Sequence, residues 1–254
     1  MYESQTQLTE KTSIAEAISN RTLLKRETLI PSNHAELIIP LDHDLEIKMV
    51  GTFRSVKLKR QEAYFLKPRG RGMVVFGNSS FILIKIYPGY SKHLIKWLDE
   101  LAQGVYRARL SRNYFDDLID AASQEDIYEV SDVLEQAFAL EHYEPNQKLK
   151  DAIALINGSC GSTSIKDIYT FMDVSKSTLE QRFNKDVGLT PKEFCKIEKL
   201  NCFIKTYKES GGVSLTELTY QCGYYDQSHL IKDFRYFLDM SPREYFQSIC
   251  KELR

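Results

Sequence analysis

The sequence predicts an α+β protein in which a small antiparallel β barrel or sandwich with added helices precedes an all-α domain. Short apolar runs separated by turn residues fill the first half of the chain, and one helical pattern is repeated in the second half. The length of 254 residues and the hydrophobic fraction of 43% allow two separate cores. We place the domains at residues 1–143 and 146–254, with a polar linker at about 141–146.

Six runs in the N-terminal half have the length and spacing of β-strands. They are residues 35–39, 45–50, 55–58, 63–66, 73–76 and 81–87. From Ser91 to about Leu140 the apolar residues instead follow helical spacing, with groups at 94–101, 114–119 and 127–138. The sequence therefore predicts a β unit followed by helical segments before the linker.

The repeat in the C-terminal half has helical rather than strand periodicity. Ile168 and Leu218 are 50 residues apart, whereas Phe183 and Phe234 are 51 residues apart. The second copy therefore has one extra residue in its turn. Each copy, at residues 164–187 and 214–238, has the pattern of two helices joined by a sharp turn, which is a helix-turn-helix.

Local signals mark where these helices begin and end. A Ser or Thr followed three residues later by an acidic residue is typical of a helix start, and this pattern occurs at Ser164, Thr190, Ser214 and Ser241. Glycine or its tolerant substitute aspartate stands at the sharp turns, as Gly188, Gly223, Asp173 and Asp239. A connecting helix at about 191–209 would be about 28 Å long. It would place the second helices of the two copies about 34 Å apart, in successive major grooves of DNA.

The C-terminal half resembles the DNA-binding domain of AraC/XylS-type transcription regulators. The resemblance rests on Cys222 to Arg235 and Met240 to Tyr245, which have a glycine, an aromatic residue, a polar pair, Ser, Leu, a basic residue, Phe and then Ser-Pro-x-x-Tyr in order. It covers residues 146–247, with departures at Lys199 and Phe203. It implies a sequence-specific transcription regulator that reads two successive major grooves.

The N-terminal half is similar to the regulatory domain of one subgroup of that family. The similar runs are His34 to Ile39 and Phe81 to Gly89. The resemblance implies a domain that binds an effector or mediates dimerisation, and it names no pocket residue.

The predicted base-reading residues lie opposite the apolar stripes of the second helices. They are Ser177, Thr178, Glu180, Gln181 and Lys185 in the first motif, and Gln227, Ser228, His229, Ile231 and Lys232 in the second. Gln181 and Gln227 have the chemistry to pair with adenine, Lys232 with guanine, Glu180 with cytosine, and Ile231 with a thymine methyl group. For phosphate contacts the predicted residues are Ser175, Lys176 and Arg235.

Several alternatives remain open from the sequence. The helical half could be plain helical packing, and Glu180 could be a solvated or ion-paired residue. For His229 a groove-facing or surface position is favoured over a role as a metal ligand. His34, Glu36 and His43 could form a cupin-like metal set, which would make the N-terminal barrel an enzyme with an accessory helical domain. A basic cluster could bind an acidic ligand, although a solvated strand face is favoured; its members are Lys57, Lys59, Arg60, Lys67, Arg69 and Arg71.

Charge and composition limit the partners. Residues 146–254 contain 16 basic and 14 acidic residues, so non-specific DNA affinity should be modest and strongly salt-dependent. We expect double-stranded DNA and the transcription machinery as partners, with a small-molecule effector and a homodimer left open. A regulator operated by a protein partner, without a small ligand, is a further alternative.

The remaining expectations concern location and cysteine chemistry. No stretch has the length or apolar character of a membrane span, and the N-terminus shows no signal-peptide core, so a cytoplasmic location is expected. We expect no metal, no cofactor and no catalytic residue. The five cysteines have no CxxC or metal spacing, and reduced, buried thiols are the favoured interpretation.

Overall fold

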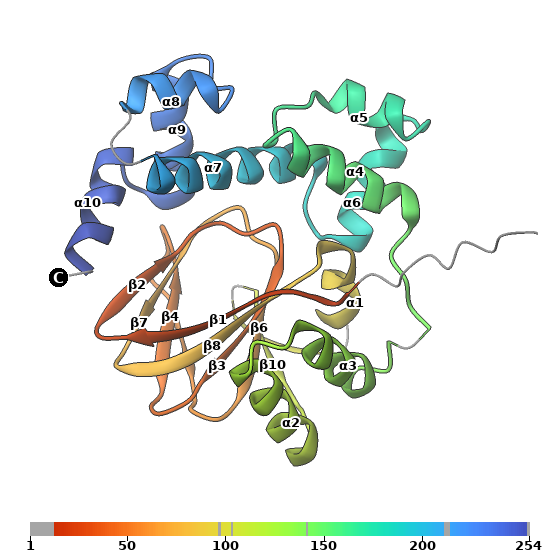
Figure 1. Cartoon of the computed structure of the whole chain (residues 1–254), viewed down its shortest axis with the longest axis vertical. Coiled ribbons are helices and arrows are strands. Elements are labelled where there is room, and N and C mark those ends of the chain that lie inside the picture. Colours follow the sequence, from red (N-terminus) through yellow and green to blue (C-terminus); the bar gives the residue numbers. More distant parts are fainter. Residues whose placement is uncertain (1–12, 96–97, 103, 141, 211–213, 253–254) are drawn as a thin grey trace, which may run out of the picture.

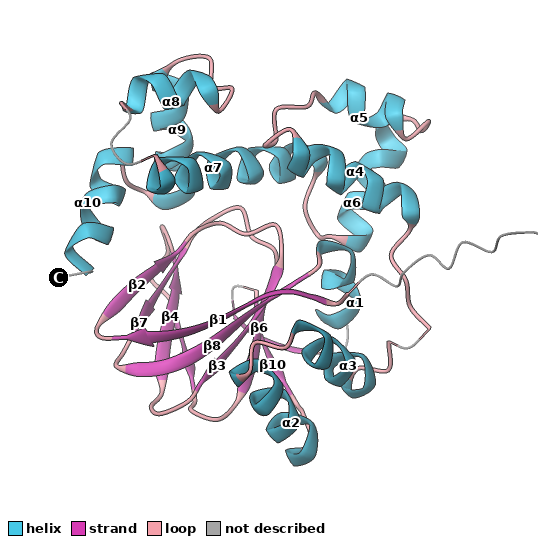
Figure 2. Ribbon diagram, in the orientation of Figure 1, coloured by secondary structure: helices cyan, strands magenta, loops and turns pink. Residues whose placement is uncertain are grey.

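The computed structural model describes residues 13–95, 98–102, 104–140, 142–210 and 214–252, and it has a β half and a helical half (Figures 1 and 2). The strands are β1 (Ala15–Leu23), β2 (Arg26–Leu29), β3 (Ala35–Pro40), β4 (Leu45–Met49), β5 (Ser55–Leu58), β6 (Ala63–Leu66), β7 (Met73–Phe76), β8 (Ser79–Ile86), β9 (Asp99–Ala102) and β10 (Val105–Ala108). The helices are η1 (Pro88–Tyr90), α1 (Ser91–Ile95), α2 (Arg112–Ser123), α3 (Ile127–Ala137), α4 (Gln147–Gly158), α5 (Ile165–Phe171), α6 (Lys176–Asp186), α7 (Pro191–Glu209), α8 (Leu215–Gln221), α9 (Gln227–Leu238) and α10 (Pro242–Glu252).

Two antiparallel sheets form the β half. One has the strand order β1-β8-β3-β6-β10-β9, and the other has the order β2-β7-β4-β5. Every residue of β3 is buried because both faces of this strand are covered. Successive side chains of a strand point to opposite faces. Ile38 accordingly packs with the four-stranded sheet, whereas Leu37 and Ile39 join the core shared with the helices.

The six predicted strands are all present, with ends that differ by at most two residues from the prediction. Four more strands, β1, β2, β9 and β10, were not predicted. Strand β1 lies at the edge of its sheet, and the residues between Ala15 and Leu23 are mostly polar and either exposed or half-buried, so it lacks a continuous apolar run.

The helix expected at 94–101 was wrong for most of its length. Helix α1 ends at Ile95, and residues 99–102 and 105–108 are strands β9 and β10. Residue pairing explains the difference, because β10 aligns with β6 and places Tyr106 opposite Phe65. Such distant pairing overrides a local helical pattern. Trp97, part of that pattern, lies outside the described residues, as does Glu141 of the expected linker.

The helical half is arranged around α7, which has the bounds predicted for the connecting helix. Helices α5 and α6 lie near one end of α7, and α8 and α9 lie near the other (Figure 1). The Thr190 side chain accepts a hydrogen bond from the backbone N–H of Glu193, and the Glu193 carboxylate accepts one from the backbone N–H of Thr190. This capping box, with Pro191 at the first helical position, sets the start of α7.

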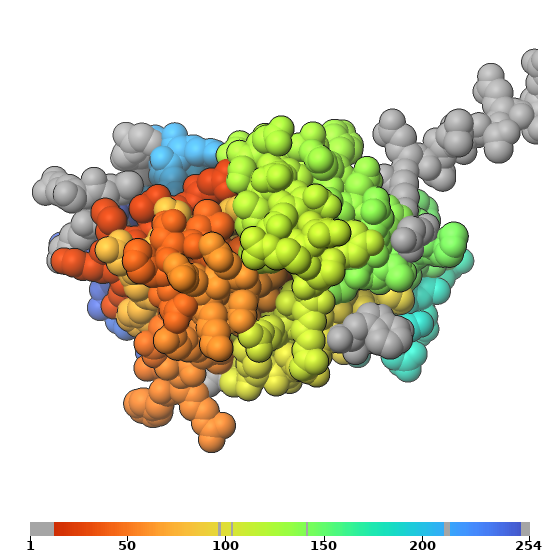
Figure 3. All heavy atoms as spheres, turned by 90° about the horizontal axis from the view of Figure 1, so that it is seen from below, coloured from red at the N-terminus to blue at the C-terminus, as the bar shows by residue number. Residues whose placement is uncertain are grey.

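The β half and the helical half are in direct contact. The side-chain amide of Asn33 donates to the backbone oxygen of Phe194 at 3.2 Å, and that of Asn201 donates to Pro31 at 3.1 Å. At the other end, the backbone N–H of Gly72 donates to the oxygen of Phe237 at 2.9 Å. The far side of the β half, with α2 and α3 beside the strands, faces away from the helix-turn-helix motifs (Figure 3).

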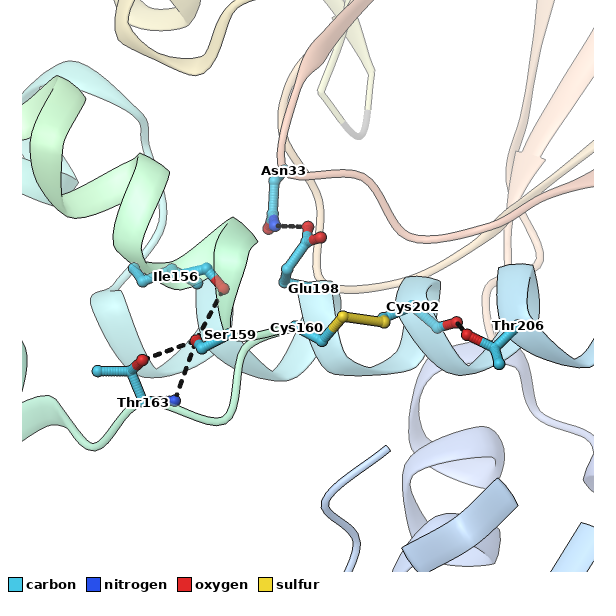
Figure 4. Close-up of a disulfide and its surroundings, with 8 residues drawn as sticks. All are labelled: Asn33, Ile156, Ser159, Cys160, Thr163, Glu198, Cys202 and Thr206. Atoms are coloured by element: carbon cyan, nitrogen blue, oxygen red, sulfur yellow. Dashed lines mark hydrogen bonds between the residues drawn. A yellow bond between two sulfur atoms is a disulfide. The ribbon is translucent and has the colours of Figure 1, made fainter. Parts of the chain in front are cut away.

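A disulfide joins α7 to the turn after α4 (Figure 4). It links Cys160 to Cys202, whose Cα atoms are 5.7 Å apart, so the expectation of reduced thiols was wrong for this pair. Cys195 and Cys222 are buried free thiols. The turn fits closely because a Cβ on Gly161 would lie 2.1 Å from the backbone oxygen of Cys195. Sequence spacing gave no sign of this pairing because the two cysteines are 42 residues apart.

None of the helices in the described part of the chain combines the length and apolar character needed to cross a membrane.

Candidate nucleic-acid interface

The first motif consists of α5, a sharp turn and α6. The hydroxyl of Ser164 caps α5 by accepting from the backbone N–H of Asp167, and the turn passes through Asp173 with a φ of +50°. The hydroxyl of Ser175 then caps α6 by accepting from the N–H of Thr178 at 3.1 Å. The left-handed conformation at an aspartate supports the predicted turn, since this residue type tolerates it better than most.

The second motif repeats this arrangement with α8 and α9. Ser214 caps α8, and Gly223 in the turn has a φ of +73°. Asp226 caps α9 by accepting from the N–H of His229 at 2.7 Å. Helix α9 ends at Asp239, which has a φ of +58°. All four turn positions predicted to be left-handed therefore have positive φ values.

Lys199 of α7 holds the turn of the second motif. Its ammonium group donates to the backbone oxygen of Gly223 at 3.0 Å and lies 5.5 Å from the ring centre of Tyr224. The residue that departs from the family pattern thus has a clear structural role: it connects the long helix to the second motif.

The side of α6 and the side of α9 that are buried in the core are those predicted from the sequence. Leu179 and Phe183 are fully buried, as is Phe234, and Leu230 is 2% exposed. The opposite faces of both helices point away from the packed core and contain the predicted polar residues. This orientation of the two helices leaves the polar residues facing outward, which is the geometric basis for the predicted base contacts. The contacts themselves stay predictions.

The predicted base-reading side chains are exposed or partly exposed. In α6, Ser177, Gln181 and Lys185 are exposed, while Thr178 and Glu180 are half-buried. In α9, every member of the predicted set is exposed: Gln227, Ser228, His229, Ile231 and Lys232. Ile231 is an apolar side chain that is 42% exposed, so the surface of α9 offers both polar and apolar contacts.

Two of the predicted phosphate-binding cations have acidic neighbours. The Lys176 ammonium lies 3.9 Å from the Glu180 carboxylate, and the Arg235 guanidinium lies 3.3 Å from the Glu244 carboxylate. Hydrogen bonds from Ser241, followed by the charge of Arg235, lower the pKa of Glu244, so this carboxylate remains charged. A phosphate would have to compete with it for Arg235.

A buried acidic residue lies behind α9. Asp233 is 4% exposed and lies 3.9 Å from the Lys196 ammonium of α7. Burial raises the pKa of Asp233, and Lys196 partly opposes this change. The nearby Tyr224 hydroxyl is also buried, which raises its pKa further above the usual range. These groups support the packing of α9 on α7 and face away from the exposed stripe.

Sequence reasoning missed two residues beside the predicted set. Thr216 of α8 accepts a hydrogen bond from the Gln227 amide at 2.6 Å. Tyr225, in the turn before α9, is 86% exposed. The second copy of the repeat has one extra residue in the turn that contains Tyr225, so the sequence did distinguish this turn. No pattern within α9 pointed to Thr216, because Thr216 lies on the preceding helix.

The cupin-like set is not assembled. His34 pairs with Glu16 at 2.6 Å, Glu36 pairs with Arg69 at 2.7 Å, and His43 lies exposed in the loop before β4. Within the described ranges no group of three or more His, Cys, Asp or Glu residues is arranged to hold a metal ion.

The basic cluster is dispersed as well. Lys57 pairs with Asp44 at 2.9 Å, whereas Arg69 is 2% exposed, so the expectation of one solvated face was wrong for Arg69. Its charge is buried because the Glu36 carboxylate is buried beside it.

Comparisons with known proteins agree with this arrangement. A helix-turn-helix domain family matches residues 168–248. The xylose operon regulatory protein of Escherichia coli strain K12 is 28% identical over 89 residues, which are 35% of this chain and 22% of that protein. The match to the same protein of Escherichia coli O157:H7 has the same extent. The chain thus spans about a fifth of the length of these relatives.

Solved structures of ToxT from Vibrio cholerae are similar over almost the whole chain. One has a TM-score of 0.57 at 12% identity and covers 91% of this chain and 98% of ToxT. Another, of ToxT with a bound unsaturated fatty acid, has a TM-score of 0.56 at 14% identity and covers 93% and 96%. The two proteins share a two-domain fold with a β half and a helical half. The family match at residues 168–248 and the likeness to these structures agree with a C-terminal domain that contains two helix-turn-helix motifs.

Proposed function

We propose that this protein is a sequence-specific DNA-binding transcription regulator, in which residues 1–143 control a DNA-binding domain at 146–254. The observation that supports this best is the exposed polar stripe on both α6 and α9, held near the two ends of α7. A helix of this kind fits the major groove, where base edges offer a distinct pattern of donors and acceptors. We propose the cytoplasm as the place where the protein meets its DNA.

The N-terminal half has contacts through which it could control both motifs. Helices η1 and α1 pack against α6 of the first motif. At the second motif, the Arg71 guanidinium lies 5.3 Å from the ring centre of Tyr236, and Gly72 bonds to Phe237. A Cβ on Gly72 would lie 2.8 Å from the end of the Leu238 side chain and 2.9 Å from the backbone oxygen of Leu29, so a larger residue here would require these neighbours to shift. A shift in the β half would therefore change the relative placement of α6 and α9.

A pocket between the two halves supports an effector site. It has a volume of about 140 Å³ and includes Arg21, Glu36 and Lys85 of the β half with Lys208 and Tyr245 of the helical half. Arg21 pairs with Glu27, and Glu36 pairs with Arg69. Among the residues that the structure describes, neither Lys85 nor Lys208 has a carboxylate within ion-pairing distance. The pocket therefore has positive charge available from both halves.

We infer from this charge that the effector is a small organic anion. ToxT, which shares the fold, has been solved with an unsaturated fatty acid and with a naphthalenyl butenoic acid. Both of those ligands are carboxylic acids. The pocket here is smaller than the roughly 300–1,000 Å³ of sites for drug-sized ligands, so binding a long acyl chain would require the two halves to separate.

Selection of random duplex DNA by the full-length protein tests the DNA-binding function. We expect enrichment of two short blocks about 34 Å apart along the duplex, one for each motif. The double variant Gln181→Ala with Gln227→Ala should lose this enrichment and keep its thermal midpoint. Equal retention of all sequences by the wild-type protein, with and without added carboxylic acids, would contradict the proposal.

Thermal unfolding in the presence of short and long carboxylic acids tests the effector site. A ligand at one hundred times its Kd should stabilise the protein by about 2.7 kcal/mol. Lys208→Met should abolish the shift, whereas Lys205→Met, on an exposed part of the same helix, should leave it unchanged. Equal shifts in both variants would contradict this location of the site.

The proposal includes no enzymatic activity. The relative from Escherichia coli is an operon regulatory protein, and the metal set that favoured an enzyme is not assembled. We propose contact with the transcription machinery. Sedimentation of the full chain would measure whether it forms a homodimer.

A further inference from the structure

Gln227 is held in place by the other helix of its motif. Its side-chain amide donates to the hydroxyl oxygen of Thr216 at 2.6 Å, across 11 residues of sequence. Both side chains are exposed, and Gln227 is the first residue of α9. The hydrogen bond therefore fixes a solvent-facing side chain at the end of α9 that would first enter a groove.

The geometry of adenine recognition gives this hydrogen bond a function. A glutamine pairs with adenine when its amide group donates to N7 and its oxygen accepts from the N6 amino group. The amide nitrogen has two hydrogens. One can bond to Thr216 while the second hydrogen and the oxygen remain free for the base.

Holding the side chain before binding also lowers the entropic cost of recognition. A free glutamine on a helix surface samples several rotamers and must be ordered when DNA binds. The bond to Thr216 orders Gln227 in the free protein. The contact with the correct base should then be stronger, while contacts with phosphates should not change.

The first motif has no such arrangement. The repeat aligns Gln227 with Lys176 and Thr216 with Lys166. Lys166 is an exposed cation that offers no acceptor, and Lys176 lies 3.9 Å from Glu180 of its own helix. The supporting hydrogen bond is therefore a particular property of the second motif.

We propose that Thr216 is a positioning residue that holds the Gln227 amide for bidentate pairing with an adenine. This inference rests on the proposed function, because it needs the second motif to read base edges. Thr216 itself does not contact a base.

The experiment uses the full-length protein and the duplex that it selects from random DNA. Binding is measured for each single base-pair substitution of that duplex, with the wild type and Gln227→Ala. We expect Gln227→Ala to remove a preference of about 5- to 150-fold at one A·T pair. Thr216→Val should reduce the preference at the same pair by about two- to tenfold, and Thr216→Ser should retain it.

The outcomes separate this inference from the proposed function. If the wild type selects no sequence, the proposed function fails and the inference fails with it. If Gln227→Ala changes one base pair but Thr216→Val does not, the function stands and the positioning role is overturned. A uniform loss of affinity in Thr216→Val, or a lower thermal midpoint with unchanged preference, would show a structural role only and would also overturn it.

Discussion

Glu36 and Arg69 form a buried ion pair, with 2.7 Å between the carboxylate Oε2 and the guanidinium Nη2 and side chains that are 5% and 1% exposed. Burial acts against the charged carboxylate, but Arg69 and Lys85 outweigh it, so the pKa of Glu36 lies below its ordinary value. Glu36 also lines the pocket between the two halves. The pair therefore links the core of the β half to the proposed effector site.

Glu36→Gln should strongly destabilise the protein, because it leaves the Arg69 charge buried without its counterion. We expect a loss of about 3–5 kcal/mol in the free energy of unfolding, measured by urea denaturation. Glu62→Gln is the matched control, since Glu62 pairs with Arg107 at a more exposed position. It should cost less than about 1 kcal/mol. Equal losses in the two variants would contradict the importance of burial.

Reduction of the Cys160–Cys202 bond should lower the free energy of unfolding by about 3–4 kcal/mol. The physical reason is the 42-residue separation, because the cross-link restricts the unfolded chain over that length. Denaturation with and without dithiothreitol measures the effect, and Cys160→Ser should not respond to the reductant. Cys195→Ala should respond as the wild type does, since burial raises the pKa of the Cys195 thiol to about 11 and keeps it unreactive. A wild type that is insensitive to reductant would show that the two thiols are unpaired in solution.

Glu198→Gln should stabilise the protein at neutral pH and have little effect in acid. Burial raises the pKa of Glu198, although His34, the Asn33 amide and Lys85 oppose this. A raised folded-state pKa gives stability that is fully present below the ordinary value of 4.5 and is lost as pH rises through the folded-state value. Glutamine removes the buried charge and still accepts the hydrogen bond from Asn33.

Thermal midpoints of Glu198→Gln and the wild type, measured on both sides of pH 4.5, check this sign. The difference in thermal midpoint between the two proteins should be small below pH 4.5. Above pH 4.5 the variant should have the higher midpoint, and the difference should grow with pH. If the difference in thermal midpoint instead became smaller as the pH rises, the charged carboxylate would be stabilising the contact between the halves.

Local signals decided which parts of the fold could be predicted. The start of α7 was predicted correctly because Thr190 and Pro191 determine it without reference to the rest of the chain. Strands β9 and β10 were missed because their structure depends on pairing between strands: β10 pairs with β6, more than thirty residues earlier, and β9 pairs with β10. The contact of Thr216 with Gln227 was missed for a related reason, since it joins two helices across a turn and has no characteristic spacing.

Lys232→Ala should weaken binding to the preferred duplex by about 1–3 kcal/mol and relax discrimination at one base pair. Lys232 is exposed on the stripe of α9 opposite Leu230 and Phe234, where guanine is its expected partner. Lys205→Ala, which removes an exposed charge from α7, is the control and should preserve the base preference. Titrations against single base-pair variants measure both, and an unchanged preference in Lys232→Ala would show that this lysine does not reach a base edge.

Lys176→Ala should weaken binding to all duplexes alike and reduce the slope of log affinity against log salt by about one. Lys176 is the first residue of α6, beside the Ser175 cap, where a cation meets the phosphate backbone rather than a base edge. Arg112→Ala removes a charge from exposed α2 in the N-terminal half and should leave the slope unchanged. A loss confined to one sequence would instead assign Lys176 to base reading. Because Glu180 lies 3.9 Å from Lys176, Glu180→Gln should strengthen phosphate binding if the charge of Lys176 is its means of contact.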